Sequence, residues 1–194
     1  MSANFLLCGI DEAGRGPLAG PVCAAAVILP ENFPFDILGD SKKLSPAARE
    51  KARIVICNDA LAWGIGWAQA AEIDEINIHR ASLLAMRRAF LAMEYHSDSE
   101  IRAVVDGLFI PDIPVPCEAL VKADSKVQAV MAASILAKTE RDHLMEHYAL
   151  LYPQYGYEKH KGYPTKAHRE AIIRCGPSPI QRMSFAVKKI DVNL

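Results

Sequence analysis

The chain has 194 residues, 51% of them hydrophobic and 23% charged, a composition typical of a globular protein that can bury a core. Its longest apolar run, residues 22–29, is too short to cross a bilayer, and the N-terminus lacks the basic region and apolar core of a secretory signal. The five cysteines are widely spaced and form no Cys-x-x-Cys pair, which argues against a zinc site or a disulfide framework. We therefore expect a cytoplasmic protein in a reducing compartment, with no membrane association.

The formal net charge of −1 conceals an uneven distribution. Residues 1–121 contain ten Lys and Arg against sixteen Asp and Glu, whereas residues 122–189 contain twelve against six. A basic C-terminal third beside an acidic remainder would suit a phosphate-binding face next to a metal-binding one, although chance clustering of solvated charges gives the same counts. No repeat or long linker divides the chain, so we expect one domain over 1–194 with a helical region from about 145 to 194.

The first element is a short apolar run, Asn4–Cys8, which has the length of a buried strand and leads into Gly9-Ile10-Asp11-Glu12-Ala13-Gly14-Arg15-Gly16-Pro17. In an extended chain Asp11 would face a site while Glu12 points away, unless the strand ends or twists between them. Gly14 and Gly16 allow main-chain amides to approach a bulky ligand, and Arg15 offers a planar fork of donors suited to phosphate. For an isolated Asp-Glu pair, a strand end with a glycine turn is the simpler interpretation, so the functional one needs support from elsewhere.

A second buried strand is predicted over Val22–Leu29, antiparallel to the first. A helix is predicted over Pro46–Asn58, with Ser45 as N-cap. Lys42 and Lys43 lie just before this helix, where lysines and helix amides together could hold a phosphate. Two loop lysines that are merely solvated are an equally good interpretation.

The next elements are a third strand over Leu61–Trp67 and a helix that follows Asp74–Asn77 and ends near Tyr95. The acids at this helix start, among them Glu72 and Glu75, interact favourably with the positive end of the helix macrodipole, and we assign them no catalytic role. A strand over Ile101–Val105 then ends in Asp106-Gly107. This sequence puts a carboxylate at a strand tip, where α/β sheets place their sites, although an Asp-Gly turn is the common alternative.

A short fifth strand over Glu118–Val121 precedes Asp124, and the longest helix is predicted from about Lys126 to Leu150. Taken alone, Asp124 is most simply the N-cap of that helix. Asp142, further along the helix, is a surface charge or a residue that supports the site from behind. The segment from Tyr152 to Thr165 interleaves aromatic and basic residues, which suits nucleic acid but equally describes a tyrosine-rich packing loop. Thr165 then caps a short helix that reaches about Arg174.

Four acids therefore stand out: Asp11, Glu12, Asp106 and Asp124. If their strands are neighbours, the carboxylates converge, and such a cluster without Cys or His favours hard cations such as Mg²⁺ or Mn²⁺. Two such ions would activate a water and stabilise the leaving oxygen of a phosphodiester.

Six motifs in order make the chain resemble bacterial ribonuclease HII from residue 9 to about residue 185. They are Asp11-Glu12-Ala13-Gly14-Arg15-Gly16-Pro17, Asp40-Ser41-Lys42-Lys43-Leu44, Val105-Asp106-Gly107, Ala123-Asp124-Ser125-Lys126, Ala132-Ala133-Ser134-Ile135-Leu136-Ala137-Lys138 and His160-Lys161-Gly162-Tyr163-Pro164-Thr165. Each motif alone is weak, whereas six in the family's order are specific.

The resemblance implies an α/β protein of the ribonuclease H-like fold, with a mixed five-stranded sheet flanked by helices and a helical C-terminal part. It also implies an endonuclease that cleaves RNA in RNA/DNA hybrids and cuts 5′ to a single ribonucleotide in duplex DNA, leaving 3′-hydroxyl and 5′-phosphate ends. Such an enzyme supports ribonucleotide removal in DNA repair and replication.

The same resemblance assigns roles to individual residues. The catalytic metal ligands would be Asp11, Glu12, Asp106 and Asp124, holding Mn²⁺ or Mg²⁺, with two metal ions expected. Gly14, Arg15 and Gly16 would read the ribose 2′-hydroxyl, Tyr163 would pack on the adjacent deoxyribose, and Lys42 or Lys43 would contact backbone phosphate.

Two other functions compete with this one. Another ribonuclease H-like metal nuclease would need the same acids without the Gly-Arg-Gly and Tyr163 pair. A non-catalytic nucleic-acid-binding module would use the acids only as turn and cap residues. No heptad seam or dimer stripe is present in the sequence, so we expect a monomer.

Overall fold

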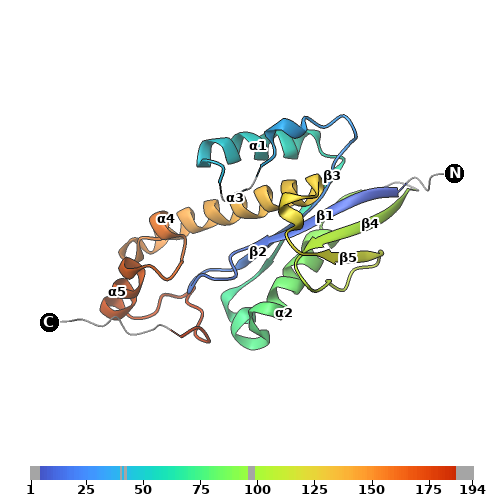
Figure 1. Ribbon diagram of the computed structural model, residues 1–194. Coiled ribbons are helices and arrows are strands. Elements are labelled where there is room, and N and C mark those ends of the chain that lie inside the picture. Colours follow the sequence, from blue (N-terminus) through green and yellow to red (C-terminus); the bar gives the residue numbers. More distant parts are fainter. Residues whose placement is uncertain (1–4, 40, 42, 96–98, 187–194) are drawn as a thin grey trace.

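Residues 5–39, 41, 43–95 and 99–186 are described by a computed structural model (Figure 1). Their strands form one five-stranded sheet in the order β3-β2-β1-β4-β5. The strands are β1 (Phe5–Ala13), β2 (Val22–Ile28), β3 (Ala62–Ala68), β4 (Glu100–Asp106) and β5 (Cys117–Leu120). The sheet is mixed, because β1, β2 and β3 are antiparallel neighbours while β4 and β5 run parallel to β1.

Two helices lie between the strands in the sequence, and the other three follow the last strand. The helices are α1 (Pro46–Asp59), α2 (Ala70–Leu91), α3 (Gln128–Leu151), α4 (Tyr157–His160) and α5 (Lys166–Cys175), with short 3₁₀ turns η1 (Phe35–Ile37), η2 (Ala123–Ser125) and η3 (Pro153–Tyr155). Figure 1 shows α4 and α5 beyond the end of the sheet, beside the last turns of α3. This arrangement confirms the expected mixed α/β architecture.

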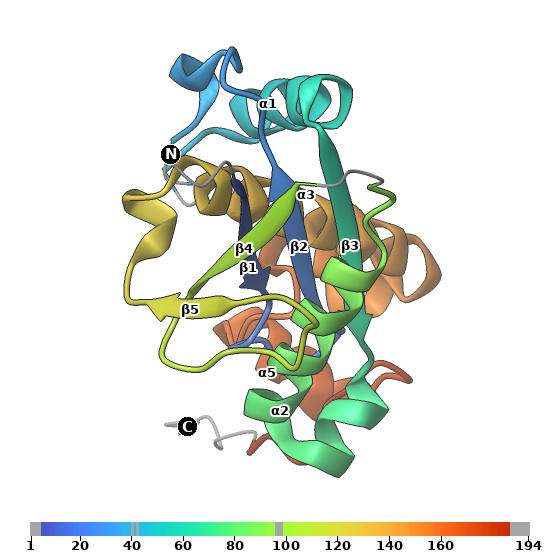
Figure 2. The same ribbon diagram turned by 90° about the vertical axis from the view of Figure 1, so that its right-hand side faces the viewer.

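Each face of the sheet is covered by its own hydrophobic core, with α2 on one side and α1 with α3 on the other (Figure 2). On the α2 face, Ile10 of β1 packs with small residues of the helix such as Ala85 and Ala89. On the opposite face, Ala25 of β2 packs with Ile56 of α1 and Leu136 of α3 among others. Alternation along β1 therefore turns Gly9 and Asp11 toward α3.

The contact between β1 and α3 is unusually close because Gly9 has no side chain. A Cβ at this position would lie 2.1 Å from both Ala129 C and Val130 N. The backbone of α3 therefore rests directly on β1, two residues before Asp11. This contact fixes the position of Asp11 along β1 relative to the first turn of α3.

The parallel register of β1 and β4 brings two of the predicted acids to the same level. Ile10 is paired with Val105, so that Asp11 and Asp106 follow at neighbouring positions where the two strands end. The expected antiparallel pairing of β1 with β2 is also present, with Asp11 opposite Ala25.

The main differences from the sequence-based expectations concern three elements. β1 continues through Asp11 and Glu12 to Ala13, because its ladder with β2 extends to the pair Ala13 and Cys23. α2 begins at Ala70, where Gln69 and Glu72 form a capping box, and the helix is kinked at Asn77 (φ 68°). α3 begins at Gln128 after the separate turn η2.

Ser45 caps α1 as predicted, since its side chain accepts from the Ala48 amide. Among the described residues, no helix is long and apolar enough to span a membrane.

The Gly9 contact makes a testable stability prediction. Gly9→Ala should lower the free energy of unfolding by about 3 kcal/mol, since the added methyl group overlaps backbone that cannot rotate away. Gly39→Ala is the matched control, because a Cβ there would meet only the flexible Leu44 side chain at 3.4 Å. Urea denaturation of both variants measures the difference. Equal stability of the two would show that β1 and α3 are not in this contact.

Candidate active site

Three carboxylates converge where β1 and β4 end. One carboxylate oxygen from each of Asp11, Asp106 and Asp124 lies within 4.8 Å of the others. Asp11 is the last-but-two residue of β1, Asp106 ends β4, and Asp124 lies in η2 between β5 and α3. The structure therefore brings three of the four predicted acids together, and their role as metal ligands stays a prediction.

The local chain explains how Asp106 and Asp124 come together. The Ala123 amide donates to Asp106 Oδ1 at 2.8 Å, which fastens η2 to the tip of β4. Lys122, at the start of η2, adopts a left-handed conformation (φ 58°) and turns the chain from β5 into the site. Asp124 is consequently not the N-cap of α3, a position that Val127 occupies.

Glu12 lines the same pocket as Asp11, although alternation would send its side chain to the opposite face. β1 ends one residue later, at Ala13, and Glu12 Oε1 is held by Arg15 Nη1 at 3.2 Å. The other oxygen, Oε2, is buried and has no hydrogen-bond partner in the described part of the chain. A buried carboxylate oxygen without a partner is costly, which indicates that something else binds it.

The electrostatics of the pocket oppose the ionised state of Asp11 and of Glu12. Burial raises the pKa of the Asp11 carboxyl well above its ordinary value, and the charge of Glu12 raises it further. Hydrogen bonds from Ser134 and from the Glu12 amide counteract only part of this. Burial also raises the pKa of Glu12, against the favourable charge of Arg15.

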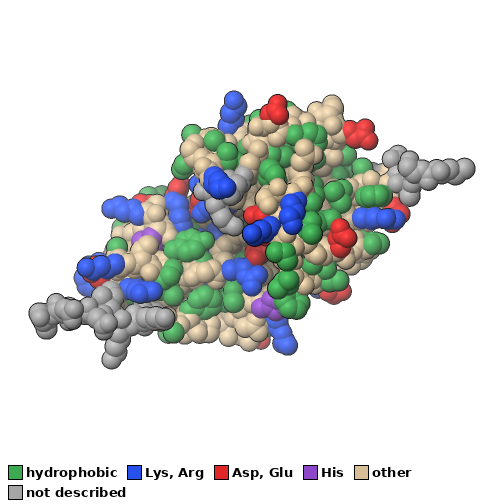
Figure 3. Space-filling view, viewed as in Figure 1, with side chains coloured by type: hydrophobic (Ala, Val, Ile, Leu, Met, Phe, Trp, Pro, Cys, Tyr) green, Lys and Arg blue, Asp and Glu red, His purple; other side chains and the backbone are tan. Residues whose placement is uncertain are grey.

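These observations fit a divalent cation. The donor set consists of carboxylate oxygens alone, without Cys or His, and such ligands suit hard cations. A cation bound among them would remove the mutual repulsion and give Glu12 Oε2 a partner. In Figure 3 a small group of acidic side chains lies near the middle of the face, with Lys and Arg side chains around it.

Gly14, Arg15, Gly16 and Tyr163 line the same pocket as Asp11, Glu12 and Asp106, although they come from opposite ends of the chain. A Cβ on Gly16 would lie 3.6 Å from an edge carbon of the Tyr163 ring, so the two residues are in contact distance. The Tyr163 side chain is partly open to solvent, with 40% of the residue exposed. The structure thus brings together Gly14–Gly16 and Tyr163, the two segments that the family resemblance assigns to one substrate.

The turn that carries Tyr163 is held by two histidines. The Gly162 amide donates to His160 Nδ1 at 3.2 Å, and His168 Nδ1 lies 3.0 Å from the Tyr163 carbonyl oxygen. The two imidazoles are stacked with centroids 4.5 Å apart. Burial lowers the pKa of His168 to about 4, so this ring is neutral at physiological pH.

The other tyrosines of this region support packing. Tyr155 and Tyr157 are buried and stack on each other with centroids 5.5 Å apart. Of the two interpretations left open for this segment, the packing loop describes these two rings, because they belong to the C-terminal hydrophobic core.

Of the two candidate phosphate-binding lysines, only Lys43 is among the described residues. Lys42 lies outside the described residues, and so does Asp40. Lys43 is exposed in the turn before α1 and is not among the described residues that line the acid pocket.

Two polar residues of α3 were missed by the sequence analysis as parts of the site. Ser134 hydrogen-bonds Asp11 and lies 2.9 Å from the Ser41 hydroxyl oxygen, while Lys138 lines the pocket one turn further on. Both belong to a series with Asp142 at intervals of four residues on an otherwise apolar helix. That spacing places them on one face and is the signal that could have identified them.

Asp142 supports Lys138 from behind. Its carboxylate accepts from Lys138 Nζ at 2.7 Å and lies 3.5 Å from Arg49 Nη2. Arg49 in turn donates to the carbonyl oxygens of Ser41 and Leu44. Asp142 therefore links the α3 side of the pocket to the turn before α1.

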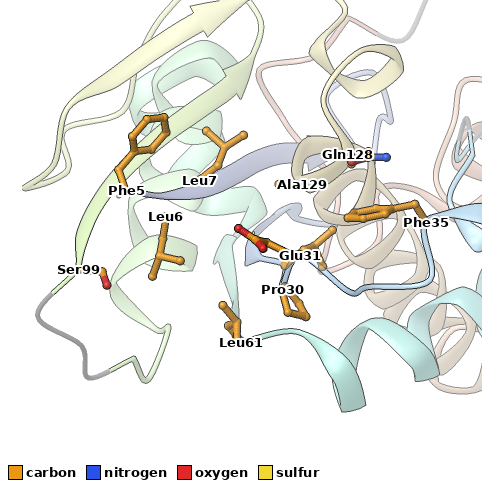
Figure 4. A pocket seen from close by; sticks show the side chains of 11 residues that line it. Phe5, Leu6, Leu7, Pro30, Glu31, Phe35, Leu61, Ser99, Gln128 and Ala129 are labelled. Carbon is orange, nitrogen blue, oxygen red and sulfur yellow. The ribbon is translucent and has the colours of Figure 1, made fainter. Parts of the chain in front are cut away.

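A wider groove lies at the opposite end of β1 (Figure 4). Phe5, Leu7 and Leu61 are among its mostly apolar lining, and Glu31 is the one acid among the described lining residues. Because converging polar groups are the mark of a reactive site, the acid pocket is the candidate active site.

The raised pKa of Asp11 makes a prediction about stability without metal. Because the folded-state pKa lies above the unfolded one, ionisation of Asp11 disfavours the folded state as the pH rises. Asp11→Asn should therefore melt at a higher temperature than the parent at neutral pH in EDTA, where each kcal/mol corresponds to about 2–4 °C. The difference should vanish below about pH 4, where Asp11 is protonated in both states.

Thermal melts over a pH series measure this effect. Added Mn²⁺ should reverse the order, because the cation binds the folded parent and not the variant. Asp112→Asn, whose parent side chain is 94% exposed, is the control and should melt with the parent. An Asp11→Asn protein that melts below the parent in EDTA at neutral pH would contradict the assignment.

Comparison with known proteins extends the motif resemblance to nearly the whole chain. A family model for ribonuclease HII matches residues 8–188. The chain is 57% identical to ribonuclease HII of Treponema denticola, an alignment that covers 95% of this chain and 100% of the relative. It is 51% identical to ribonuclease HII of Dechloromonas aromatica, with coverage of 93% and 90%.

Solved structures show the same fold. Ribonuclease H2 from Pyrococcus horikoshii is similar with a TM-score of 0.74 at 25% identity, covering 94% of this chain and 95% of that one. Ribonuclease HII from Archaeoglobus fulgidus, solved in complex with PCNA, gives a TM-score of 0.73 at 25% identity, with coverage of 97% and 98%. On these grounds the chain belongs to the ribonuclease HII family of endonucleolytic hydrolases.

Proposed function

We propose that this protein is a divalent-metal-dependent endoribonuclease that cleaves RNA in RNA/DNA hybrids and cuts 5′ to single ribonucleotides in duplex DNA. The products carry 3′-hydroxyl and 5′-phosphate ends. One observation carries the proposal: the carboxylates of Asp11, Asp106 and Asp124 converge within 4.8 Å, and two of them, Asp11 and Asp106, line a pocket that Gly14–Gly16 and Tyr163 also line. A hydrolytic centre and a sugar-reading surface thus lie side by side.

In the proposed mechanism, Asp11, Asp106 and Asp124 hold the metal, and the free oxygen of Glu12 completes the ligand set. Mg²⁺ or Mn²⁺ bound there, two ions in our proposal, would supply an activated water and charge stabilisation for the leaving oxygen. Ser134 fixes the orientation of Asp11 by a hydrogen bond, and the Ala123 amide does the same for Asp106. Lys138, held by Asp142, contributes a positive charge at the edge of the pocket where a phosphate would enter.

Selectivity for a ribonucleotide requires recognition of the 2′-hydroxyl, the group that separates RNA from DNA. Main-chain groups of Gly14–Gly16 can approach it closely because two of these three residues lack side chains. The Tyr163 ring, in contact distance of Gly16, would rest on C2′ of the following sugar, where a deoxyribose fits and a ribose is crowded. Such a pair reads a junction between RNA and DNA and not a base sequence.

We also propose a cellular setting. The chain would act as one catalytic domain over 1–194, as a monomer in the cytoplasm, in ribonucleotide removal during DNA repair and replication. All five cysteines are free thiols, which suits a reducing compartment. Lys42 or Lys43 would contact backbone phosphate.

The decisive experiment uses a labelled DNA duplex with one embedded ribonucleotide, incubated with the protein in Mg²⁺, in Mn²⁺ and in EDTA. A metal-dependent nick on the 5′ side of the ribonucleotide is expected. Cleavage of a continuous RNA/DNA hybrid alone would instead indicate a general hybrid nuclease. Binding without cleavage of either substrate would indicate a non-catalytic module.

Asp106→Asn should lower turnover in this assay by several orders of magnitude while duplex binding is largely retained. Asparagine keeps an oxygen that can accept from the Ala123 amide, so η2 stays in place while the negative charge is lost. Turnover and binding are measured on the same labelled duplex, with the exposed Asp112→Asn as control. Unchanged turnover would refute the role of Asp106.

Tyr163→Ala should reduce cleavage at a single ribonucleotide about tenfold more than cleavage of a continuous hybrid, because it removes the ring beside Gly16. Tyr163→Phe is the matched variant and should behave like the parent, since the proposed contact uses the ring face and not the hydroxyl. The ratio of kcat/KM on the two substrates is the quantity to compare. An unaltered ratio in Tyr163→Ala would count against the sugar-reading role.

A further inference from the structure

Arg182 is buried completely, with 0% of the residue exposed, and its guanidinium donates three hydrogen bonds to the loop between β1 and β2. Its Nη2 donates to the Gly14 carbonyl oxygen at 2.6 Å, and its Nη1 donates to that of Arg15 at 3.0 Å. Its Nε donates to the Gly20 carbonyl oxygen at 2.8 Å. One planar guanidinium therefore fixes the directions of two successive peptide groups at the edge of the acid pocket.

The direction of those carbonyl groups determines the direction of the amides. In a trans peptide the N–H points away from the C=O of the same peptide, and the described chain has no cis peptide bond. The Arg15 amide therefore points away from Arg182, as does the Gly16 amide. Arg15 and Gly16 line the acid pocket, and neither amide has a hydrogen-bond acceptor in the described part of the chain.

Resting on the proposed function, we infer that Arg182 is a positioning residue that directs the amides of Arg15 and Gly16 toward the sugar-phosphate backbone of the substrate. A cation on the carbonyl oxygen also polarises the peptide, which strengthens the N–H at its other end as a donor. Two oriented amides then present positive dipole ends to a phosphate or to a 2′-hydroxyl oxygen. Arg182 itself stays on the far side of the loop and contacts no substrate.

A second buried arginine holds the neighbouring part of the loop. Arg141, 1% exposed, donates to the carbonyl oxygens of Ala19, Pro21 and Lys161. Arg141 therefore ties the loop to the turn that carries Tyr163, whereas Arg182 acts on the peptides that line the pocket.

Both cations are costly to bury. Burial and the charge of Arg141 lower the pKa of Arg182 to about 9, so Arg182 remains charged at neutral pH. Attachment of the C-terminal segment does not by itself require a buried arginine. That segment is already attached through Asp74, whose carboxylate accepts from the amides of Met183 and Ser184 at 2.9 Å.

The test compares Arg182→Lys with Arg174→Lys. Lysine keeps the charge but loses the fork, so it cannot hold the carbonyl groups of Gly14 and Arg15 together. Arg174 also donates to a backbone carbonyl oxygen, that of Gln154, but lies in α5 away from the loop. We measure kcat/KM on the single-ribonucleotide duplex and on a continuous hybrid, the melting temperature, and the amide resonances of Arg15 and Gly16.

Arg182→Lys should lower kcat/KM on the single-ribonucleotide duplex about ten- to hundredfold more than on the hybrid, a loss of the size expected for small misplacements. The amide resonances of Arg15 and Gly16 should shift, while Arg174→Lys behaves like the parent in every measurement. Equal losses on both substrates, or unshifted amide resonances, would overturn the inference.

Two further results keep the inference separate from folding and from the proposed function. If Arg182→Lys does not fold, the parent carries the test, since binding of the duplex should protect the Arg15 and Gly16 amides from hydrogen exchange. Unprotected amides would refute the inference. If the parent shows no activity on the single-ribonucleotide duplex, the proposed function fails, and the amide resonances of Arg182→Lys still decide whether Arg182 orients the loop.

Discussion

Repulsion among the carboxylates of Asp11, Asp106 and Asp124 is the constraint on which this structure depends. Isolated in water, such groups would separate, but here one oxygen of each stays within 4.8 Å of the others. The parallel register of β1 with β4 brings Asp11 and Asp106 level, and the Ala123 amide fastens η2 to Asp106. The fold therefore holds a charge arrangement that is unfavourable by itself and becomes favourable when a cation binds.

Close packing makes this rigidity possible. Gly9 lets the backbone of α3 rest on β1, which places Ser134 within hydrogen-bonding distance of Asp11. The small residues Ala132, Ala133 and Ala137 serve the same purpose on the α3 face of the sheet. Close-packed protein interiors have low compressibility. The strands and helix that carry the acids therefore cannot move apart to relieve the repulsion between the carboxylates.

The sequence carried enough information for most of the fold and for the acids. Asp11 and Asp106 could be recognised because each follows a short buried strand, and parallel neighbours bring such ends together. Asp124 could not be placed by the same reasoning, since an Asp before a long helix is most simply a cap. Its actual position depends on the left-handed Lys122 and the Asp106 contact with Ala123, which are tertiary features.

Other residues escaped for different physical reasons. α2 starts at Ala70 because Gln69 and Glu72 form a capping box, a signal weaker in sequence than the acidic Asp74–Asn77 stretch. Arg182 carries no local signal at all, because its three acceptors are backbone carbonyl groups more than 160 residues away. Because the partners of Arg182 are backbone groups distant in the sequence, no pattern of side chains predicts these contacts.

The loop between β1 and β2 separates two opposite charge environments. On one side lie the acids of the pocket, and on the other lie the buried guanidinium groups of Arg141 and Arg182. The carbonyl groups of Gly14 and Arg15 accept from Arg182, so the amides of the same peptides point away from that cation. A nucleic-acid backbone brings negative charge to a site that is itself acidic, and a metal alone would have to offset both. Peptide dipoles oriented by buried arginines add positive potential at the pocket edge without placing a mobile side chain beside the metal ligands.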